Sequence, residues 1–297
     1  KFGRSGKTIV VDIDPVEHSK KTVSIDKLII SDVGDFLREL INYKLSPTSM
    51  DWRDKCIKWK KLFPNCEDKF KGGELVDLYY LSEALSENLL ESSVVVTDSG
   101  LAELILPSNI SFRKGMRCIH PASQGSMGYA LPAAVGAYYS SKLPVVTVVG
   151  DGSIMMNLQE LETIRYHNLP IKIIVINNNA YAVIRKRQVD IFRTRTIGTD
   201  PANGVSCPDF KKVADTFGLA YVFISSTKEL QKKIKEVLEM DGPVLCEIMS
   251  PEDQDYISVA HSRTLESGFV RRPLEDQAPF IDRDIFLSEM IVEPIDQ

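Results

Sequence analysis

Two short polar segments follow apolar runs in the middle of the chain, and their residue types suit a metal–phosphate site. Residues 150–153 read Gly-Asp-Gly-Ser after the apolar run at 145–149, and three asparagines at 177–179 follow the run at 171–176. A carboxylate and an amide oxygen with few other charges suit Mg²⁺, which keeps waters and lets substrate phosphates complete its six-oxygen shell. Glycines allow a close approach of the backbone, and N–H groups at a helix start can meet a phosphate. The two segments together predict a Mg²⁺–diphosphate site.

A hairpin turn is the alternative explanation of Asp151-Gly152, because Asp-Gly is a strong hairpin signal. A hairpin needs a second strand at once, and the next β-branched run begins only at Ile171. The residues between predict a crossover, which makes the flanking strands parallel and brings their C-terminal ends to one ligand-binding edge. Asparagines after a strand are by themselves more typical of a turn. The joint occurrence of both segments, 27 residues apart from Asp151 to Asn178, favours a site.

The elements that must position these segments form a regular alternation. Apolar runs separated by helical patterns predict the α/β class, with a doubly wound, mostly parallel sheet and helices on both faces. Strands are expected within residues 92–100, 145–149, 171–176, 220–225 and 242–250. Helices are expected within 33–41, 75–89, 125–141, 157–167, 207–218 and 226–240, the last opened by a capping box from Ser226 to Glu229.

Composition excludes several classes of function. The net charge of −5 and the pI near 5.5 argue against a nucleic-acid surface, and no basic stripe interleaved with aromatics occurs. No apolar run approaches the ~20 residues of a membrane span. The five cysteines are scattered and form no Cys-x-x-Cys pair, so neither a disulfide framework nor a zinc site is expected. Reduced thiols predict a cytoplasmic protein.

Several segments together resemble the thiamine diphosphate-dependent enzymes of the acetolactate synthase-like family. The Gly-Asp-Gly-Ser and Asn-Asn motifs are similar to the family's cofactor motif, and GSMGYALPAAVGA at 125–137 is similar to the segment that precedes it. VVVTDSG at 94–100 resembles the strand that opens the pyrophosphate domain, and TIVVDIDPVE at 8–17 the end of the central domain. The resemblance implies the thiamine diphosphate-binding fold.

The resemblance also implies a domain order. Residues 1–46 would be the C-terminal part of a central Rossmann-like domain, and residues 47–73 a helical linker. Residues 74–250 would form the thiamine diphosphate (pyrophosphate)-binding domain, followed by a C-terminal extension at 251–297. The family's N-terminal pyrimidine-binding domain would lie before these residues or on another subunit.

Site residues follow from the matched motifs. Asp151, Asn178 and the backbone carbonyl of Ala180 would bind Mg²⁺, while Gly152 and Ser153 would hold the diphosphate of thiamine diphosphate. Met127 would be the bulky residue beneath the cofactor that forces its bent shape, although a methionine among small residues is by itself more typical of core packing. The cofactor-binding positions expected in full are Gly125, Met127, Gly150, Asp151, Gly152, Ser153, Asn178, Ala180 and Tyr181.

The implied activity is decarboxylation of a 2-oxo acid followed by carboligation to a second carbonyl compound. The family's activating glutamate belongs to the pyrimidine-binding domain, usually of a neighbouring subunit, so the catalytic residue is expected outside this chain's matched motifs. A homodimer or homotetramer with shared active sites is implied. A simple 2-oxo acid decarboxylase, a non-catalytic cofactor-binding subunit of a split enzyme and a plain nucleotide-binding α/β domain are the alternatives.

Two departures from the family pattern bear on the substrate. Acetolactate synthases read Gly-Met-Val-x-Gln-Trp after the asparagines, where this chain has AVIRKR at 182–187, and Leu101-Ala102 replace an expected Gln-His pair. A reaction other than pyruvate to acetolactate is therefore expected. The cationic residues at 185–187 suit either an anionic substrate or, more simply, a solvated loop. The sequence leaves open the donor acid, the acceptor and an FAD in the central domain.

Overall fold

The computed structural model describes residues 3–20, 23–192, 195–257, 261–264, 268–278 and 280–295. The chain divides into two compact units, which are described separately. The first unit combines residues 1–62 with residues 257–297, and the second unit comprises residues 63–256. The predicted domain boundaries stay predictions. No helix in the described part of the chain is long and apolar enough to cross a bilayer.

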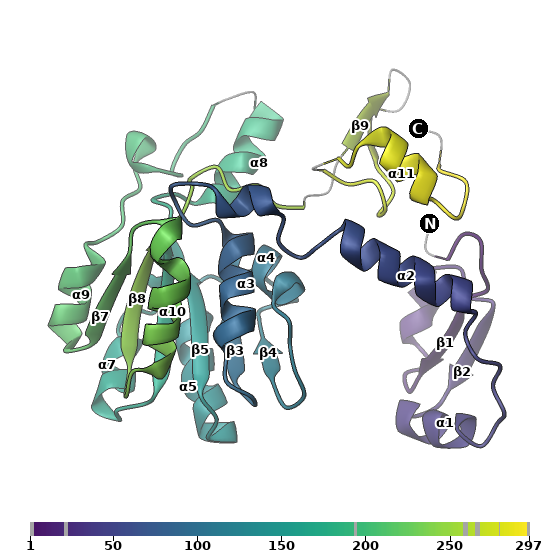
Figure 1. Cartoon of the computed structure of the whole chain (residues 1–297), viewed down its shortest axis with the longest axis horizontal. Coiled ribbons are helices and arrows are strands. Elements are labelled where there is room, and N and C mark those ends of the chain that lie inside the picture. Colours follow the sequence, from purple (N-terminus) through teal and green to yellow (C-terminus); the bar gives the residue numbers. More distant parts are fainter. Residues whose placement is uncertain are drawn as a thin grey trace. The chain divides into compact units, whose positions relative to one another are not determined.

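The second unit is built on a six-stranded sheet in the order β4-β3-β5-β6-β8-β7, in which every neighbouring pair is parallel (Figure 1). Its strands are β3 Val94–Thr97, β4 Arg117–Ile119, β5 Val145–Gly150, β6 Ile171–Asn177, β7 Ala220–Ile224 and β8 Val244–Met249. Because β4 and β5 lie on opposite sides of β3, the strand order reverses there. The α/β prediction with a parallel sheet is confirmed.

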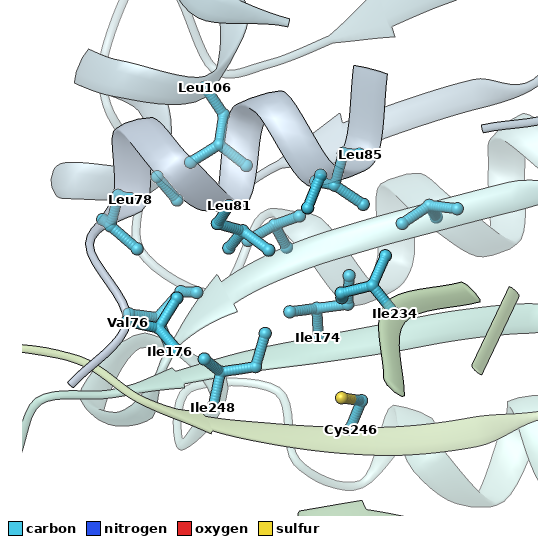
Figure 2. Close-up of a cluster of buried hydrophobic side chains, with 14 of the residues drawn as sticks. Val76, Leu78, Leu81, Leu85, Leu106, Ile174, Ile176, Ile234, Cys246 and Ile248 are labelled. Atoms are coloured by element: carbon cyan, nitrogen blue, oxygen red, sulfur yellow. The ribbon is translucent and has the colours of Figure 1, made fainter. Parts of the chain in front are cut away.

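Helices cover both faces of this sheet, since successive strand residues point to opposite sides and both sides are apolar. One face packs against α3 Leu78–Asn88, α4 Leu101–Asn109 and α10 Leu230–Glu239. Figure 2 shows part of this layer, where Leu81 and Leu85 of α3 lie beside Ile174 of β6. The other face packs against α5 Ala130–Ser141, α7 Glu160–Tyr166 and α9 Phe210–Phe217.

The second unit contains five further helical elements in its described residues. They are η2 Asp68–Lys71, α6 Asp151–Ile154, α8 Ala182–Phe192, η3 Pro201–Asn203 and η4 Thr227–Glu229. The single helix expected over 157–167 begins only at Glu160. The side chain of Asn157 instead donates to the carbonyl of Gly128 (2.7 Å), so it braces the loop before α5.

The first unit is small and leaves apolar surface uncovered. Its elements are β1 Ile9–Asp12, η1 Glu17–Lys20, β2 Lys27–Ile30, α1 Val33–Leu40, α2 Met50–Leu62, β9 His261–Thr264, β10 Gly268–Arg271 and α11 Arg283–Glu289. Asp32 caps α1 by accepting from the N–H groups of Gly34 and Asp35. Ile9, Ile30 and Ile41 are exposed, and neither α1 nor α2 contains a buried residue. β1 and β2 pair in parallel, and the described residues leave Ile9 of β1 and Ile30 of β2 uncovered.

A buried carboxylate joins two helices of the first unit. Glu289, the last residue of α11, accepts from Nζ of Lys55 (2.9 Å), from Nζ of Lys58 and from Nε1 of Trp59 (2.9 Å), all on α2. The bonds from Lys55 and Lys58 lower the pKa of Glu289 from 4.5 to about 2. The lowered pKa means that folding favours the ionised carboxylate.

Acid is therefore expected to loosen this helix pair. The stabilisation from Glu289 is fully present above pH 4.5, its ordinary pKa, and is lost as the pH falls towards 2. Glu289→Gln should lower the melting temperature at neutral pH and flatten its dependence on pH between 4.5 and 2. Glu17→Gln, which removes an exposed partner of Lys20, is the control and should follow the parent. Identical acid profiles for the parent and Glu289→Gln would contradict this assignment.

Candidate functional site

A pocket of about 250 Å³ opens at the C-terminal ends of β3, β5 and β6. It therefore lies beside the reversal of strand order, which is where open α/β sheets bind ligands. All the predicted cofactor-binding positions line it, namely Gly125, Met127, Gly150, Asp151, Gly152, Ser153, Asn178, Ala180 and Tyr181. The rest of the lining consists of Ser99, Gly100, Leu101, Ala102, Ile176, Ala182, Val183 and Ile184. Segments from four parts of the sequence thus meet in one cavity.

Asp151 connects the ends of β5 and β6. It is only 2% exposed, and its Oδ2 accepts from the N–H groups of Asn178 (3.1 Å) and Asn179 (2.6 Å). Its Oδ1 accepts from the N–H of Gly152 (2.6 Å). Asn179 adopts a left-handed φ of 55°, which turns the chain sharply after β6. The carboxylate therefore holds the asparagine turn against the Gly-Asp-Gly-Ser segment.

The charge on Asp151 is tuned by its surroundings. Burial raises the pKa of this carboxyl to about 6, although the three N–H groups and the thiol of Cys207 pull it lower. Burial and the neighbouring carboxylate raise the pKa of Cys207 to about 12, so that residue stays a neutral thiol that hydrogen-bonds Asp151. At neutral pH the carboxylate is mostly ionised, as a metal ligand must be.

The donor set fits a hard cation such as Mg²⁺. Asp151, Asn178 and Ala180 are all buried and line the same pocket, and they offer a carboxylate, an amide oxygen and a backbone carbonyl. Mg²⁺ prefers such oxygen ligands and keeps several waters. In the described part of the chain, no group of three or more His, Cys, Asp or Glu side chains could hold a metal. Those residues therefore contain no cluster of cysteine and histidine side chains of the kind that binds a softer metal.

Gly152 and Tyr181 form a tight contact on one wall. A Cβ atom added to Gly152 would lie 2.0 Å from Cε1 of Tyr181, so the aromatic ring packs directly on the backbone of the glycine. The N–H of Tyr181 donates to the carbonyl of Thr199 (2.7 Å), which fixes the start of α8. Burial raises the pKa of Tyr181, and the neighbouring Cys207 and Asp151 add to that shift. The ring therefore stays a neutral phenol beside the carboxylate.

Sequence patterns missed some of the residues that shape this site. Asp98, fully buried after β3, bonds the loop that carries Met127 and the hydroxyl of Ser153. The sequence does carry one signal for Asp98, because this acidic residue follows an apolar strand just as Asp151 does. Cys207 is one of several scattered thiols, and nothing in its local sequence points to the carboxylate that it contacts.

The basic residues after the asparagines lie on a helix and not in a solvated loop. Arg185 of α8 pairs with Asp200 (3.6 Å from Nε), with Asp253 (3.2 Å from Nη1) and with Glu252. Its charge is thus used to hold α8 to neighbouring segments, which leaves it poorly placed to receive an anionic substrate. The apolar start of α8 faces the pocket instead, beside the Leu101-Ala102 pair.

Comparisons with known proteins agree with this geometry. The family described as thiamine pyrophosphate enzyme, C-terminal TPP binding domain, matches residues 98–248. The acetolactate synthase large subunit of Cyanidium caldarium is 30% identical over 275 residues, which is 89% of this chain and 45% of that protein. Acetolactate synthase 1, chloroplastic, of Oryza sativa subsp. japonica is 29% identical, covering 88% of this chain and 42% of that protein. The chain spans less than half the length of these relatives.

Proposed function

The chain belongs to the thiamine pyrophosphate enzymes and carries their C-terminal cofactor-binding domain, and we propose that it acts, with thiamine diphosphate and Mg²⁺, on a 2-oxo acid by decarboxylation and carboligation. The observation that carries this proposal is the meeting of all the predicted cofactor positions in one pocket. The two polar segments that predicted a metal–diphosphate site lie side by side there, joined by the Asp151 carboxylate.

Each residue has a defined task in this proposal. Asp151, Asn178 and the carbonyl of Ala180 hold Mg²⁺, while Gly152 and Ser153, at the start of α6, hold the diphosphate. Met127, which is 39% exposed and lines the pocket, supports the cofactor from below. Bound thiamine diphosphate supplies the electron sink for decarboxylation.

The other residues that line the pocket favour carboligation over simple decarboxylation, in which the carbon left after CO₂ loss is protonated. Leu101, Ala102, Val183 and Ile184 line the pocket with apolar groups, and such groups keep water away from the reacting carbon. Leu101 and Ala102 also occupy the positions at which acetolactate synthases are expected to carry a polar Gln-His pair. We therefore infer an acceptor other than the pyruvate used to make acetolactate. A simple decarboxylase remains the alternative reaction.

The whole protein requires more than the second unit. The activating glutamate would come from a pyrimidine-binding domain, in a homodimer or homotetramer with shared sites. The first unit would be the end of a central domain, and its uncovered apolar side chains, such as Ile9 and Ile30, support that role. The sequence leaves open whether FAD binds to such a domain, and a cytoplasmic location stays a prediction.

Calorimetry on the intact protein tests the cofactor assignment. Thiamine diphosphate should release heat of binding with Mg²⁺ present and little after chelation, because the diphosphate needs the cation. Product analysis with pyruvate then separates the reactions: acetoin- or acetolactate-type products indicate ligation, and free aldehyde indicates decarboxylation. Binding of a dinucleotide with no response to thiamine diphosphate would reject the proposal in favour of a nucleotide-binding domain. Cofactor binding without turnover on any 2-oxo acid would favour the non-catalytic subunit.

A further inference from the structure

We propose that Asp98 is a positioning residue of the cofactor site. Its carboxylate fixes the position of the loop that carries Met127, and it does so together with the hydroxyl of Ser153, which bonds the same carboxylate. The inference rests on the proposed function and deepens it. Asp98 is fully buried one residue beyond β3 and does not line the pocket. It can therefore affect the site only through the groups that it holds.

The carboxylate of Asp98 collects hydrogen bonds from three separate segments. Its Oδ1 accepts from the N–H groups of Ser99 (2.8 Å) and Gly128 (3.1 Å) and from the hydroxyl of Ser153. Its Oδ2 accepts from the N–H of Ala130 (2.8 Å). All four donors are neutral, and a buried carboxylate needs such bonds to offset its lost hydration. The acid thus joins the end of β3, the loop before α5 and the start of α6.

This arrangement replaces a missing helix cap. Helix α5 begins at Ala130, and its N-cap residue, Tyr129, makes no side-chain capping bond. Asp98 lies beside the start of α5, because it accepts from the N–H of Ala130, the first residue of the helix, and from the N–H of Gly128 just before it. The helix dipole favours a negative charge there. The direction in which α5 leaves the loop is therefore set by a residue from β3.

The Gly128 peptide is held on both sides. Its N–H donates to Asp98 and to Oγ of Ser153 (3.0 Å), and its carbonyl accepts from the side chain of Asn157 (2.7 Å). Gly128 has φ 79°, and an added Cβ would lie 2.6 Å from Cβ of Met156, so the turn tolerates only glycine. Met127 directly precedes this fixed peptide, so the position of its backbone is determined by the same bonds.

The network also defines the task of Ser153. Its hydroxyl donates to Asp98 and accepts from Gly128, so the side chain is engaged inside the protein. Ser153, at the start of α6, nevertheless lines the pocket. Ser153 therefore assists the diphosphate through its main chain, while its hydroxyl works through Asp98 on the loop of Met127.

The test compares Asp98→Asn, Ser153→Ala and the double variant with the parent, all as intact protein. Asn cannot replace Asp98, because its NH₂ group would face a backbone or hydroxyl donor in either orientation. The matched control is Asp77→Asn: Asp77 caps α3 by accepting from the N–H of Tyr79 (2.8 Å) and is not part of the pocket lining. Thermal unfolding, the affinity for thiamine diphosphate with Mg²⁺, and the near-ultraviolet circular dichroism of the bound cofactor are measured for each.

Asp98→Asn is expected to weaken cofactor binding at least about tenfold and to change the dichroism of the bound cofactor, since a buried group loses its partners. Ser153→Ala should weaken binding by about fivefold, and the double variant should bind no worse than Asp98→Asn, because both residues act through the same peptide. Asp77→Asn should lose stability while keeping the affinity and the dichroism of the parent.

Three results would overturn the inference. The first is that Asp98→Asn loses stability to the same degree as Asp77→Asn but keeps the parent's affinity for thiamine diphosphate and its dichroism. The second is that the losses of affinity in Ser153→Ala and Asp98→Asn add up in the double variant. That result would mean that the Ser153 hydroxyl contacts the diphosphate directly. If Asp98→Asn fails to fold, parental affinity and dichroism in Ser153→Ala would decide against the network. Failure of the proposed function differs from all three, because the parent itself would not bind thiamine diphosphate.

Discussion

Replacing Asp151 by asparagine is expected to weaken Mg²⁺-dependent binding of thiamine diphosphate by roughly a hundredfold or more. Changes to groups that merely support metal ligands typically cost about 10–100-fold, and Asp151 is proposed as a ligand itself. The amide would also turn an NH₂ group towards one of the N–H donors that now bond the carboxylate, from Gly152, Asn178 and Asn179. The variant thus loses both the charge and the tether of the asparagine turn.

Titration calorimetry with thiamine diphosphate, at several Mg²⁺ concentrations, measures this loss. Asp209→Asn serves as the control, because Asp209 caps α9 by accepting from the N–H of Lys212 (3.1 Å) and lies outside the pocket lining. It should bind the cofactor as the parent does. Parental affinity in Asp151→Asn, with the same Mg²⁺ dependence, would show that the cation is held elsewhere.

Gly152→Ala is expected to damage both the fold and the site. The new Cβ would lie 2.0 Å from Cε1 of Tyr181, a separation that the packed ring cannot accept without moving. Overpacking of this kind costs about 1–3 kcal/mol of unfolding free energy. The displaced ring would enter the pocket that both residues line, so binding of thiamine diphosphate should fall below detection.

Chemical denaturation and calorimetry check this second expectation. Gly136→Ala is the matched control, because Gly136 lies inside α5 with no atom within 4 Å of an added Cβ. That change should stabilise the protein by about 0.5–1 kcal/mol. Adding Tyr181→Ala to Gly152→Ala should restore much of the lost stability by removing the ring. Equal effects of the two glycine changes would contradict the contact.

The sheet and the location of the site could be predicted because both follow from local patterns. β5 and β6 are continuous β-branched runs, and parallel pairing places their polar ends, at Asp151 and Asn178, on one edge whatever the loops do. The three-residue edge strand β4 carries no such pattern. Its existence depends on pairing with β3, which the local sequence does not report.

Features that depend on distant partners could not be predicted in this way. The local sequence around Arg185 suits a solvated basic loop, because one of the carboxylate partners of this residue, Asp253, lies 68 residues further along the chain. The capping box expected from Ser226 to Glu229 is not formed, since Ser226 makes no capping bond and Glu229 accepts from the N–H of Ser225 (3.2 Å). Asp98 likewise acts on a loop residue 30 positions away and on a residue of α6 55 positions away.

The thiol that contacts Asp151 has a consequence for the chemical durability of the pocket. Oxidants and alkylating reagents attack the thiolate form of cysteine. Because the pKa of Cys207 is about 12, almost none of that form exists at neutral pH. A cysteine beside a proposed metal ligand would ordinarily be the weak point of such a site. Here burial, helped by the neighbouring carboxylate, keeps Cys207 in its thiol form, so this cysteine is expected to react only slowly with such reagents.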